Sequence, residues 1–378
     1  MIRLGPGKVN YRPTWAEVDL KAIKFNLRQI RRLIGKGIAV MPVVKANAYG
    51  HGIVEVSSAL RDEGVEYLGV ATIDEALRLR ERHINIPILI LGSVLEEEAE
   101  IAIKNDITLT LAGCELLKTI SKVCGDTARR AKVHIKVDTG MGRIGIWHEE
   151  ALDFIKKAVC EKDVIIDGIY THFSSAARDD FFTQYQIDSF KNLLERIENN
   201  GIEIKYKHAA NSIATIAIKD AYLNLVRPGI IIYGMYPKKG FEKLIKLKPA
   251  LSLKTRVTYL KDTPEGRSIS YGRTYITQKH TRIATLPIGY ADGYGRILSN
   301  KAEVLIRGKR APVVGKVTMD QTMVDVGEIR GVKVGDEVVL IGKQGFEEIR
   351  TENLARLAGS IAYEVVCSIS NRVPRIYK

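Results

Sequence analysis

Short apolar runs alternate with longer amphipathic segments through the first two-thirds of this chain of 378 residues. The clearest amphipathic segment spans residues 20–34, with Asp19 as a plausible N-cap and Gly35 at its C-terminal stop. Strand and helix alternate about eight times, which predicts a parallel sheet. Eight units within ~230 residues favour a closed (β/α)8 barrel over an open sheet. We expect the strands of this part at residues 15–18, 38–44, 67–70, 88–91, 107–111, 133–137, 165–171, 206–209 and 229–233.

The pattern changes after Met235. Short β-rich runs separated by turns predict a mostly antiparallel β domain, with one late helix over residues 351–357. We therefore expect an α/β chain in three parts: a segment at 1–12 that fits neither pattern, a TIM-like barrel at 13–240 and a β domain at 241–378. The β runs are expected at residues 254–259, 282–286, 302–306, 311–317, 322–326 and 337–341.

Polar residues stand where several of the expected barrel strands end. In a (β/α)8 barrel the active site lies at the carboxyl ends of the strands, where the βα loops meet. The coincidence supports the barrel independently of any other argument, and it predicts that this end carries the chemistry. The residues concerned are Lys45, Lys136, Asp138, His172, Asn211 and Ser212, and Arg227 stands just before the last expected strand.

Charge and composition favour a soluble cytoplasmic protein. The net charge is +14, but the basic residues are dispersed, which favours a solvated mixed-charge surface over a nucleic-acid interface. No apolar run approaches the ~20 residues that span a bilayer, and residues 1–13 lack the apolar core of a secretory signal. The 4 cysteines are scattered without metal-ligand spacing and suit a reducing compartment. We expect no metal, membrane or nucleic-acid partner.

The run PVVKANAYGHG at residues 42–52 places Lys45 at the end of a short apolar strand. A buried lysine is unfavourable unless it is paired, neutralised or used covalently. Desolvation lowers the pKa of an amine and exposes a nucleophile, which activates lysines toward aldehydes. The alternative is a lysine that reaches solvent from the strand end. The run resembles the motif around the cofactor lysine of the alanine racemases, and the resemblance extends from Trp15 to Tyr377.

The resemblance implies a barrel followed by a β domain, with the segment 1–12 paired with the C-terminal domain. It also implies that Lys45 binds pyridoxal 5'-phosphate (PLP) covalently and that the protein interconverts L-alanine and D-alanine, supplying D-alanine for cell-wall peptidoglycan. Glycine lets a backbone amide approach a phosphate closely, and hydroxyl groups can add hydrogen bonds. The resemblance assigns to the phosphate Tyr49, Ser212, Gly229, Ile230 and Tyr363.

Arg227 is the residue that the resemblance places against the pyridine nitrogen of PLP. Arginine stays protonated at any relevant pH, so it would keep that nitrogen unprotonated and weaken the ring as an electron sink. A short-lived carbanion favours reprotonation at Cα over transamination. The resemblance gives His172 a supporting role beside the ring, within hydrogen-bond reach of Arg227.

The glycine-rich run KVDTGMGRIG at residues 136–145 is a second motif of the same family. The resemblance implies that Arg143 contacts the phenolic oxygen of PLP and the substrate carboxylate. It also implies that Lys136 is carbamylated. A carbamate reverses the charge of the lysine, so that Lys136 and Arg143 attract instead of repelling each other.

Racemisation at Cα needs a proton acceptor on one face and a proton donor on the other. The resemblance assigns these roles to Lys45 and Tyr271, and it implies that the backbone of Met319 holds the substrate carboxylate. In the family, Tyr271, Tyr290, Met319 and Asp320 come from the partner subunit. The resemblance therefore implies a homodimer with shared active sites.

Three departures from the family pattern affect no acid, base or cofactor contact. They are Thr318 in place of cysteine, Ala362 in place of asparagine, and the loop at 174–177. A broader racemase acting on serine or basic amino acids remains an alternative, because the substrate pocket depends on geometry. A non-catalytic PLP carrier is disfavoured by the β domain and Tyr271, and a nucleic-acid-binding module by the absence of a recognition motif.

Overall fold

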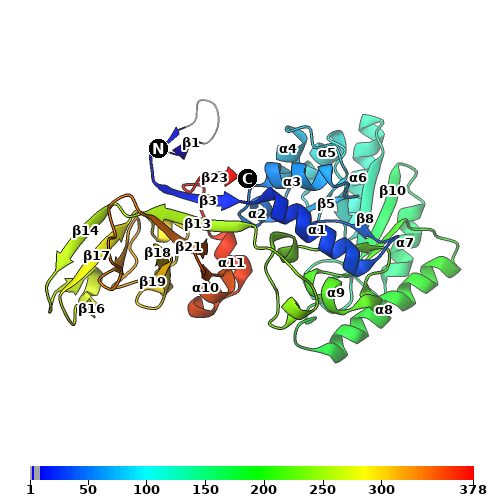
Figure 1. Cartoon of the computed structure of the whole chain (residues 1–378). Coiled ribbons are helices and arrows are strands. Elements are labelled where there is room, and N and C mark those ends of the chain that lie inside the picture. Colours follow the sequence, from blue (N-terminus) through cyan, green and yellow to red (C-terminus); the bar gives the residue numbers. More distant parts are fainter. Residues whose placement is uncertain (1, 4–8) are drawn as a thin grey trace.

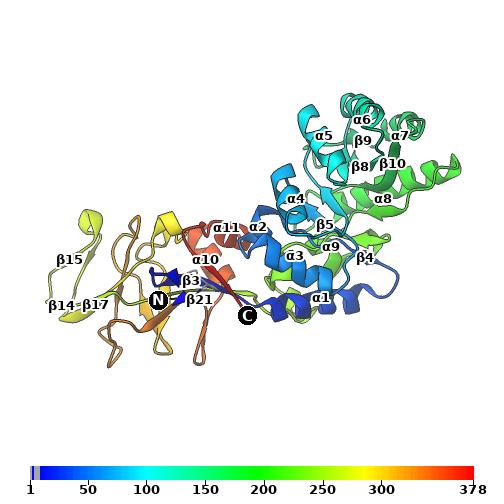
Figure 2. The ribbon, with the colours of Figure 1, turned by 90° about the horizontal axis from the view of Figure 1, so that it is seen from above.

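The computed structural model describes residues 2–3 and 9–378, and it shows a barrel beside a β-rich domain (Figure 1). Seen from above, the two parts lie side by side and the C-terminus lies near their junction (Figure 2). Residues 1 and 4–8, on which part of the predicted 1–12 segment falls, lie outside the described residues. Within that segment, β1 (Ile2–Arg3) and β2 (Val9–Asn10) pair antiparallel with each other.

Eight short parallel strands form the barrel in the described part of the chain. They follow one another in chain order, and each neighbours the next. Single contacts join the strands that do not share a continuous ladder. The Val43–Gly69 bridge joins the first strand to the second, the Leu89–Thr108 bridge the third to the fourth, and the hydrogen bond from the Arg227 amide to the Ala210 carbonyl the seventh to the eighth. The Leu225–Ala39 pair joins the eighth strand to the first and closes the barrel. The strands are β4 (Ala39–Val40), β5 (Leu68–Val70), β6 (Ile88–Ile90), β7 (Leu109–Leu111), β8 (Ala131–Asp138), β10 (Val164–Tyr170), β11 (Tyr206–His208) and β12 (Leu225–Val226). The closed barrel confirms the predicted fold class.

Helices surround the barrel, and α1 (Leu20–Ile34) closes the ring. The α1 helix precedes the first barrel strand and packs against both α3 and α9. It begins where the Asp19 carboxylate accepts the amide of Ala22 at 2.9 Å and ends at Gly35, as predicted. The other helices of the ring are α3 (Ile53–Asp62), α4 (Ile73–Arg80), α5 (Glu96–Lys104), α6 (Cys114–Thr127), α7 (Ala151–Val159), α8 (Asp180–Asn199) and α9 (Ser212–Ala217).

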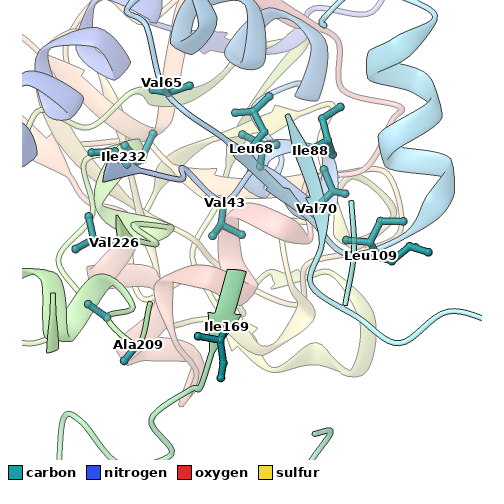
Figure 3. Close-up of a cluster of buried hydrophobic side chains, with 14 of the residues drawn as sticks. Val43, Val65, Leu68, Val70, Ile88, Leu109, Ile169, Ala209, Val226 and Ile232 are labelled. Atoms are coloured by element: carbon teal, nitrogen blue, oxygen red, sulfur yellow. The ribbon is translucent and has the colours of Figure 1, made fainter. Parts of the chain in front are cut away.

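Aliphatic side chains from successive barrel strands fill the core (Figure 3). Leu68, Val70, Ile88, Leu109 and Ile169 are completely buried there. Each fully buried side chain of this size contributes about 1.5–3 kcal/mol relative to exposure. The continuous apolar runs of the sequence therefore become strands buried on both faces, as parallel sheets require.

The β domain contains a mixed sheet, a smaller antiparallel sheet and a hairpin. The large sheet runs in the order β19–β18–β21–β13–β3–β23, with β22 paired to β21, and the smaller one is β14–β17–β20. Every pair is antiparallel except the β3–β23 pair, which joins the two ends of the chain. Their bounds are β3 (Thr14–Val18), β13 (Leu251–Arg256), β14 (Tyr259–Thr263), β15 (Ser268–Ile269), β16 (Tyr275–Ile276), β17 (Thr281–Leu286), β18 (Glu303–Ile306), β19 (Lys309–Pro312), β20 (Thr322–Asp325), β21 (Glu337–Gln344), β22 (Glu347–Ile349) and β23 (Arg375–Tyr377).

Three sequence predictions are corrected by the structure. The strand at 15–18 exists as β3, but it pairs with β13 and β23 in the β domain and not in the barrel. The run at 229–233 is the 3-10 helix η2 (Ile230–Tyr233), because Pro228 has no amide hydrogen to continue the ladder of β12. The expected late helix forms as α10 (Thr351–Ala358), and a second one, α11 (Ala362–Cys367), follows it. None of the helices in the described ranges is long and apolar enough to cross a membrane.

Candidate active site

A cavity of about 730 Å³ opens at the carboxyl ends of the barrel strands. It is bounded by βα loops and, from the C-terminal part of the chain, by α11. The structure brings to it most of the residues that the sequence singles out: Lys45, Tyr49, Lys136, Arg143, His172, Ser212, Arg227, Gly229 and Tyr363. Ile230 lies next to Gly229 and is completely buried.

Lys45 begins a short turn of left-handed backbone, α2 (Lys45–Tyr49). Its next four residues, Ala46 to Tyr49, have φ between 52° and 54°. This conformation costs an L-residue roughly 1–2 kcal/mol each, so other contacts must hold it. The turn follows the isolated bridge between Val43 and Gly69, and both Lys45 and Tyr49 line the cavity.

Glu75, from the first turn of α4, holds the left-handed turn in place. Its two carboxylate oxygens accept the amide of Ala46 at 2.6 Å and that of Ala71 at 2.8 Å. On the other side of the turn, the side chain of Asn47 accepts the amide of Ile53 at 2.9 Å. Hydrogen bonds to charged groups are worth about 1.5–3 kcal/mol each, which offsets much of the backbone strain.

The environment of Lys45 favours its unprotonated form. Burial lowers the pKa of the Lys45 amine, and the positive charge of Arg143 lowers it further against the opposing effect of Glu75. A larger unprotonated fraction makes the amine a better nucleophile toward an aldehyde.

Hydroxyl groups and a backbone amide converge at the corner between β12 and α9. The amide of Gly229 donates to Ser212 Oγ at 2.8 Å, and Tyr363 lines the same cavity as Ser212. A Cβ at position 229 would lie 2.6 Å from the hydroxyl oxygen of Tyr49 and 3.6 Å from Ser212 Oγ. A larger residue at this position would therefore displace the Tyr49 hydroxyl, and the corner offers donors that suit a phosphate.

Arg227 lies beneath the cavity, only 4% exposed. Its Nη1 donates to His208 Nδ1 at 2.7 Å, and its Nη2 donates to the carbonyls of Thr171 at 2.7 Å and Ala209 at 3.0 Å. Nη2 also lies 3.4 Å from His172 Nδ1. Burial lowers the pKa of Arg227 to about 10, so the guanidinium stays charged at neutral pH.

His172 is held neutral beside this cation. Burial and then the charge of Arg227 lower the pKa of His172 well below its usual value. Within the described residues, no carboxylate contacts Arg227, so its charge is not cancelled locally. A ring nitrogen placed against this guanidinium would face a permanent cation.

The glycine-rich loop after β8 is organised by Asp138. The carboxylate of Asp138 accepts the backbone amides of Gly140 at 2.8 Å, Met141 at 2.9 Å, Gly142 at 2.9 Å and Arg143 at 3.3 Å. The nest of amides fixes the backbone from which Arg143 enters the cavity. The hydrogen bonds outweigh burial and leave the pKa of Asp138 below its usual value.

Lys136 lies at the cavity floor and is 2% exposed. Its Nζ donates to the carbonyl of Val137 at 2.7 Å. Burial lowers the pKa of Lys136 to about 8, with Arg227 and Arg143 adding to the effect and Asp138 opposing it. The unprotonated fraction of this amine near neutral pH is therefore larger than for an ordinary lysine, although the protonated form still predominates at pH 7.

The chemistry of these donors fits PLP. The group of donors at Tyr49, Ser212, Gly229 and Tyr363, here called the hydroxyl corner, suits the phosphate of PLP. The Lys45 amine suits its aldehyde, and Arg227 suits its ring nitrogen. No group of histidine, cysteine, aspartate or glutamate among the described residues is arranged to hold a metal ion.

The remaining predicted residues do not lie in this cavity within one chain. Tyr271 is 72% exposed in the 3-10 helix η4 (Tyr271–Arg273), next to the β15–β16 hairpin at the end of the β domain remote from the barrel (Figures 1 and 2). Met319 is 52% exposed and Tyr290 41% exposed. Asp320 accepts a hydrogen bond from Arg372 at 2.7 Å on the surface of the same domain.

Sequence reasoning missed the structural roles of Glu75, Asp138 and His208. Asp138 carried a signal, because an aspartate directly before a glycine-rich turn commonly accepts backbone amides. Glu75 carried none, since it is remote in sequence from the turn that it holds. His208 is the last residue of β11, but only the closed barrel brings it to Arg227.

Comparisons with known proteins agree with this geometry. The family model of the alanine racemase N-terminal domain matches residues 18–237, and that of the C-terminal domain matches residues 250–377. The chain is 49% identical over 368 residues to the alanine racemase of Methanococcus maripaludis, covering 97% of this chain and 98% of the relative. It is 48% identical over 368 residues to the alanine racemase of Halothermothrix orenii, covering 97% of each.

Solved structures resemble the whole chain as well. The alanine racemase of Clostridium difficile 630 superposes with a TM-score of 0.93 at 40% identity, covering 98% of this chain and 97% of that one. The Bacillus anthracis enzyme with bound L-Ala-P gives a TM-score of 0.92 at 40% identity, covering 98% and 96%. With both domains matched over nearly their full length, the chain belongs to the PLP-dependent alanine racemase family.

Proposed function

We propose that this protein racemises alanine with PLP, using Lys45 and Tyr271 as the two acid-base groups. The observation that carries the proposal is the joint arrangement of Lys45, the hydroxyl corner and Arg227 around one cavity. When bound, PLP would hold the amino acid covalently and withdraw electrons from Cα, which acidifies the Cα–H bond. Everything else is done by groups of the protein.

Three groups of residues would hold the cofactor. Lys45 would supply the covalent link, and Tyr49, Ser212, Gly229, Ile230 and Tyr363 would hold the phosphate. Arg227, with His172 beside it, would bind the ring nitrogen. A charged arginine there would keep that nitrogen unprotonated and make the ring a weaker electron sink, which favours return of a proton to Cα over transamination.

Two bases on opposite faces exchange the proton. The Lys45 amine, with its lowered pKa, takes or gives the proton on one face. The Tyr271 hydroxyl does so on the other face. Arg143 and the backbone of Met319 bind the substrate carboxylate, and Tyr290 and Asp320 support the site.

Lys136 acts as a carbamate that orients Arg143. Carbamate formation joins an unprotonated amine to carbon dioxide and releases one proton, and the lowered pKa of about 8 increases the unprotonated fraction of Lys136 near neutral pH. The product carries a negative charge, so the cluster of Lys136, Arg143 and Arg227 no longer consists of three cations.

Tyr271 reaches Lys45 by dimerisation. Its exposure and its remoteness from the barrel of its own chain support a site completed by a second copy, together with the exposed Tyr290 and Met319. Such a protein is a cytoplasmic homodimer that supplies D-alanine for peptidoglycan.

A stereochemical assay in deuterated water tests the proposal. L-alanine should lose its optical activity and gain deuterium at Cα, and D-alanine should do the same. Serine and basic amino acids in the same panel test the broader racemase. Absence of racemisation of alanine by the PLP-loaded protein would contradict the proposal.

A further inference from the structure

A line of polar side chains crosses the barrel interior away from the cavity. From Arg227 it passes to His208 at 2.7 Å, and His208 Nε2 lies 2.8 Å from His134 Nδ1. His134 Nε2 lies 3.8 Å from Asp167 Oδ2, whose carboxylate accepts the hydroxyl of Tyr67 at 2.6 Å. Both imidazoles are completely buried.

The hydrogen-bond directions along this line are determined by Arg227. A guanidinium only donates hydrogen bonds, so Nδ1 of His208 must be the acceptor. A neutral His208 then carries its proton on Nε2 and donates it to Nδ1 of His134. His134 in turn carries its proton on Nε2, toward the carboxylate of Asp167.

Both imidazoles are neutral links. Burial and then the charge of Arg227 lower the pKa of His208. Burial also lowers the pKa of His134, although Asp167 opposes the effect. The only full charges on the line are therefore the guanidinium at one end and the carboxylate at the other.

Asp167 keeps its charge despite partial burial. Burial raises the pKa of Asp167, but His134 and Tyr67 outweigh that effect and leave the pKa below its usual value. Within the described residues, Nε2 of His134 has no hydrogen-bond partner. Asp167 Oδ2 is the acid oxygen that the structure places opposite it.

The backbone around the two histidines is adapted to this line. A Cβ at Gly168 would lie 2.4 Å from Nδ1 of His134, so only glycine lets that ring lie against β10. The pairing of β10 with β8 shifts register between Ile166 and Gly168, on either side of Asp167. Such irregularities redirect a side chain. The ring of Tyr170 stacks on His208 at 4.8 Å with an interplanar angle of 3°.

We propose that Asp167 is a positioning residue and the counter-charge of Arg227, acting through neutral, Nε2-protonated His134 and His208. The inference rests on the proposed function only for its consequence in catalysis. A carboxylate in direct contact would cancel the field of Arg227 at the cofactor nitrogen. With the two neutral imidazoles of His208 and His134 in between, Asp167 stabilises the buried Arg227 guanidinium from a distance. The positive potential of Arg227 at the cavity is then only weakly reduced.

A double-mutant cycle on the cofactor-free protein tests the coupling. Asp167→Asn should lower the apparent Tm by about 2–4 °C, and the decrease should be clearly smaller when Arg227→Met is also present, with only the part due to the Tyr67 hydroxyl remaining. Asp220→Asn, at an exposed aspartate paired with Lys191, is the matched control and should behave alike in both backgrounds. Equal decreases from Asp167→Asn in both backgrounds would overturn the proposal.

Nitrogen-15 NMR of the cofactor-free protein tests the tautomers independently. The signals of His134 and His208 should be those of neutral rings protonated at Nε2 between pH 6 and pH 8. A charged ring, or a proton on Nδ1 of His208, would contradict the assignment. This measurement needs no activity, so it stands apart from a failure of the proposed function.

A matched pair of variants tests the consequence in the PLP-loaded enzyme. His208→Glu places a carboxylate directly against Arg227, whereas His208→Gln keeps a neutral acceptor. His208→Glu should raise pyruvate formation from alanine several-fold relative to racemisation, and His208→Gln should not. Equal pyruvate formation by the two variants would overturn the separation of charge as the role of the histidines.

Discussion

The proposed sharing of active sites predicts how two inactive variants behave when they are mixed. Lys45→Ala removes the amine in the barrel, and Tyr271→Phe removes the hydroxyl on the β domain. Each variant alone should lose nearly all racemisation, because each lesion falls in both sites of its own dimer. Tyr271→Phe should still bind PLP covalently, whereas Lys45→Ala should not.

A mixed dimer distributes the two lesions differently. If each site takes its lysine from one copy and its tyrosine from the other, one site of the mixed dimer carries both lesions and its second site carries neither. Random exchange of equal amounts gives mixed dimers in about half of the population, by the symmetry of a two-fold dimer. About a quarter of all sites are then intact, and activity should return to about 25% of wild type.

The location of Tyr271 in the single chain is the reason for this expectation. It is 72% exposed and does not line the cavity that contains Lys45. If Tyr271 instead reached the cavity of its own chain, every site of the mixed dimer would carry one lesion, and no activity would return.

The assay is co-expression of the two variants with different affinity tags, followed by tandem purification of the mixed dimer. Each purified mixed dimer should have about half the activity of a wild-type dimer, since one of its two sites is intact. A control mixes Lys45→Ala with itself under both tags and should stay inactive. Mixed dimers as inactive as that control would refute the shared site.

Three further predictions concern the cofactor site and its charges. Arg227→Glu should permit detectable transamination, measured as pyruvate released from alanine; no pyruvate from the PLP-loaded variant would count against the ring-nitrogen argument. Gly229→Ala should weaken PLP binding on the order of ten-fold, because its Cβ would lie 2.6 Å from the Tyr49 hydroxyl oxygen; equilibrium titration of the cofactor-free protein measures this, and unchanged affinity would refute the close approach. The pKa of Lys136 in the folded protein, about 8, lies below that of a lysine in the unfolded chain. Between about pH 8 and pH 10.4 the unfolded chain therefore binds more protons, and the free energy of unfolding rises with pH. In carbonate-free buffer, Lys136→Met should remove up to about 3 kcal/mol of that gain in denaturant titrations of the cofactor-free protein; an unchanged pH dependence would contradict the lowered pKa.

The sequence by itself determined the barrel architecture and most of its elements, and it identified the polar residues that line the cavity. Apolar runs become buried strands and amphipathic segments become helices, because both patterns depend on residues close together in sequence. Asp19 and Gly35 accordingly begin and end α1, as predicted. The cluster of polar residues at strand ends was also readable, because a parallel barrel brings all such ends to one opening. Lys45, Lys136 and Arg227 meet there for that reason.

Only the tertiary structure decided which distant segments meet. The strand at 15–18 has the same pattern as a barrel strand, yet β3 pairs with β13 and β23, because an apolar pattern specifies burial and not a partner. Glu75 holds the turn after Lys45, and Asp167 lies across the barrel from Arg227; both relations depend on how the strands close. Contacts of this kind arise from packing between remote parts of the chain, which local residue order does not encode.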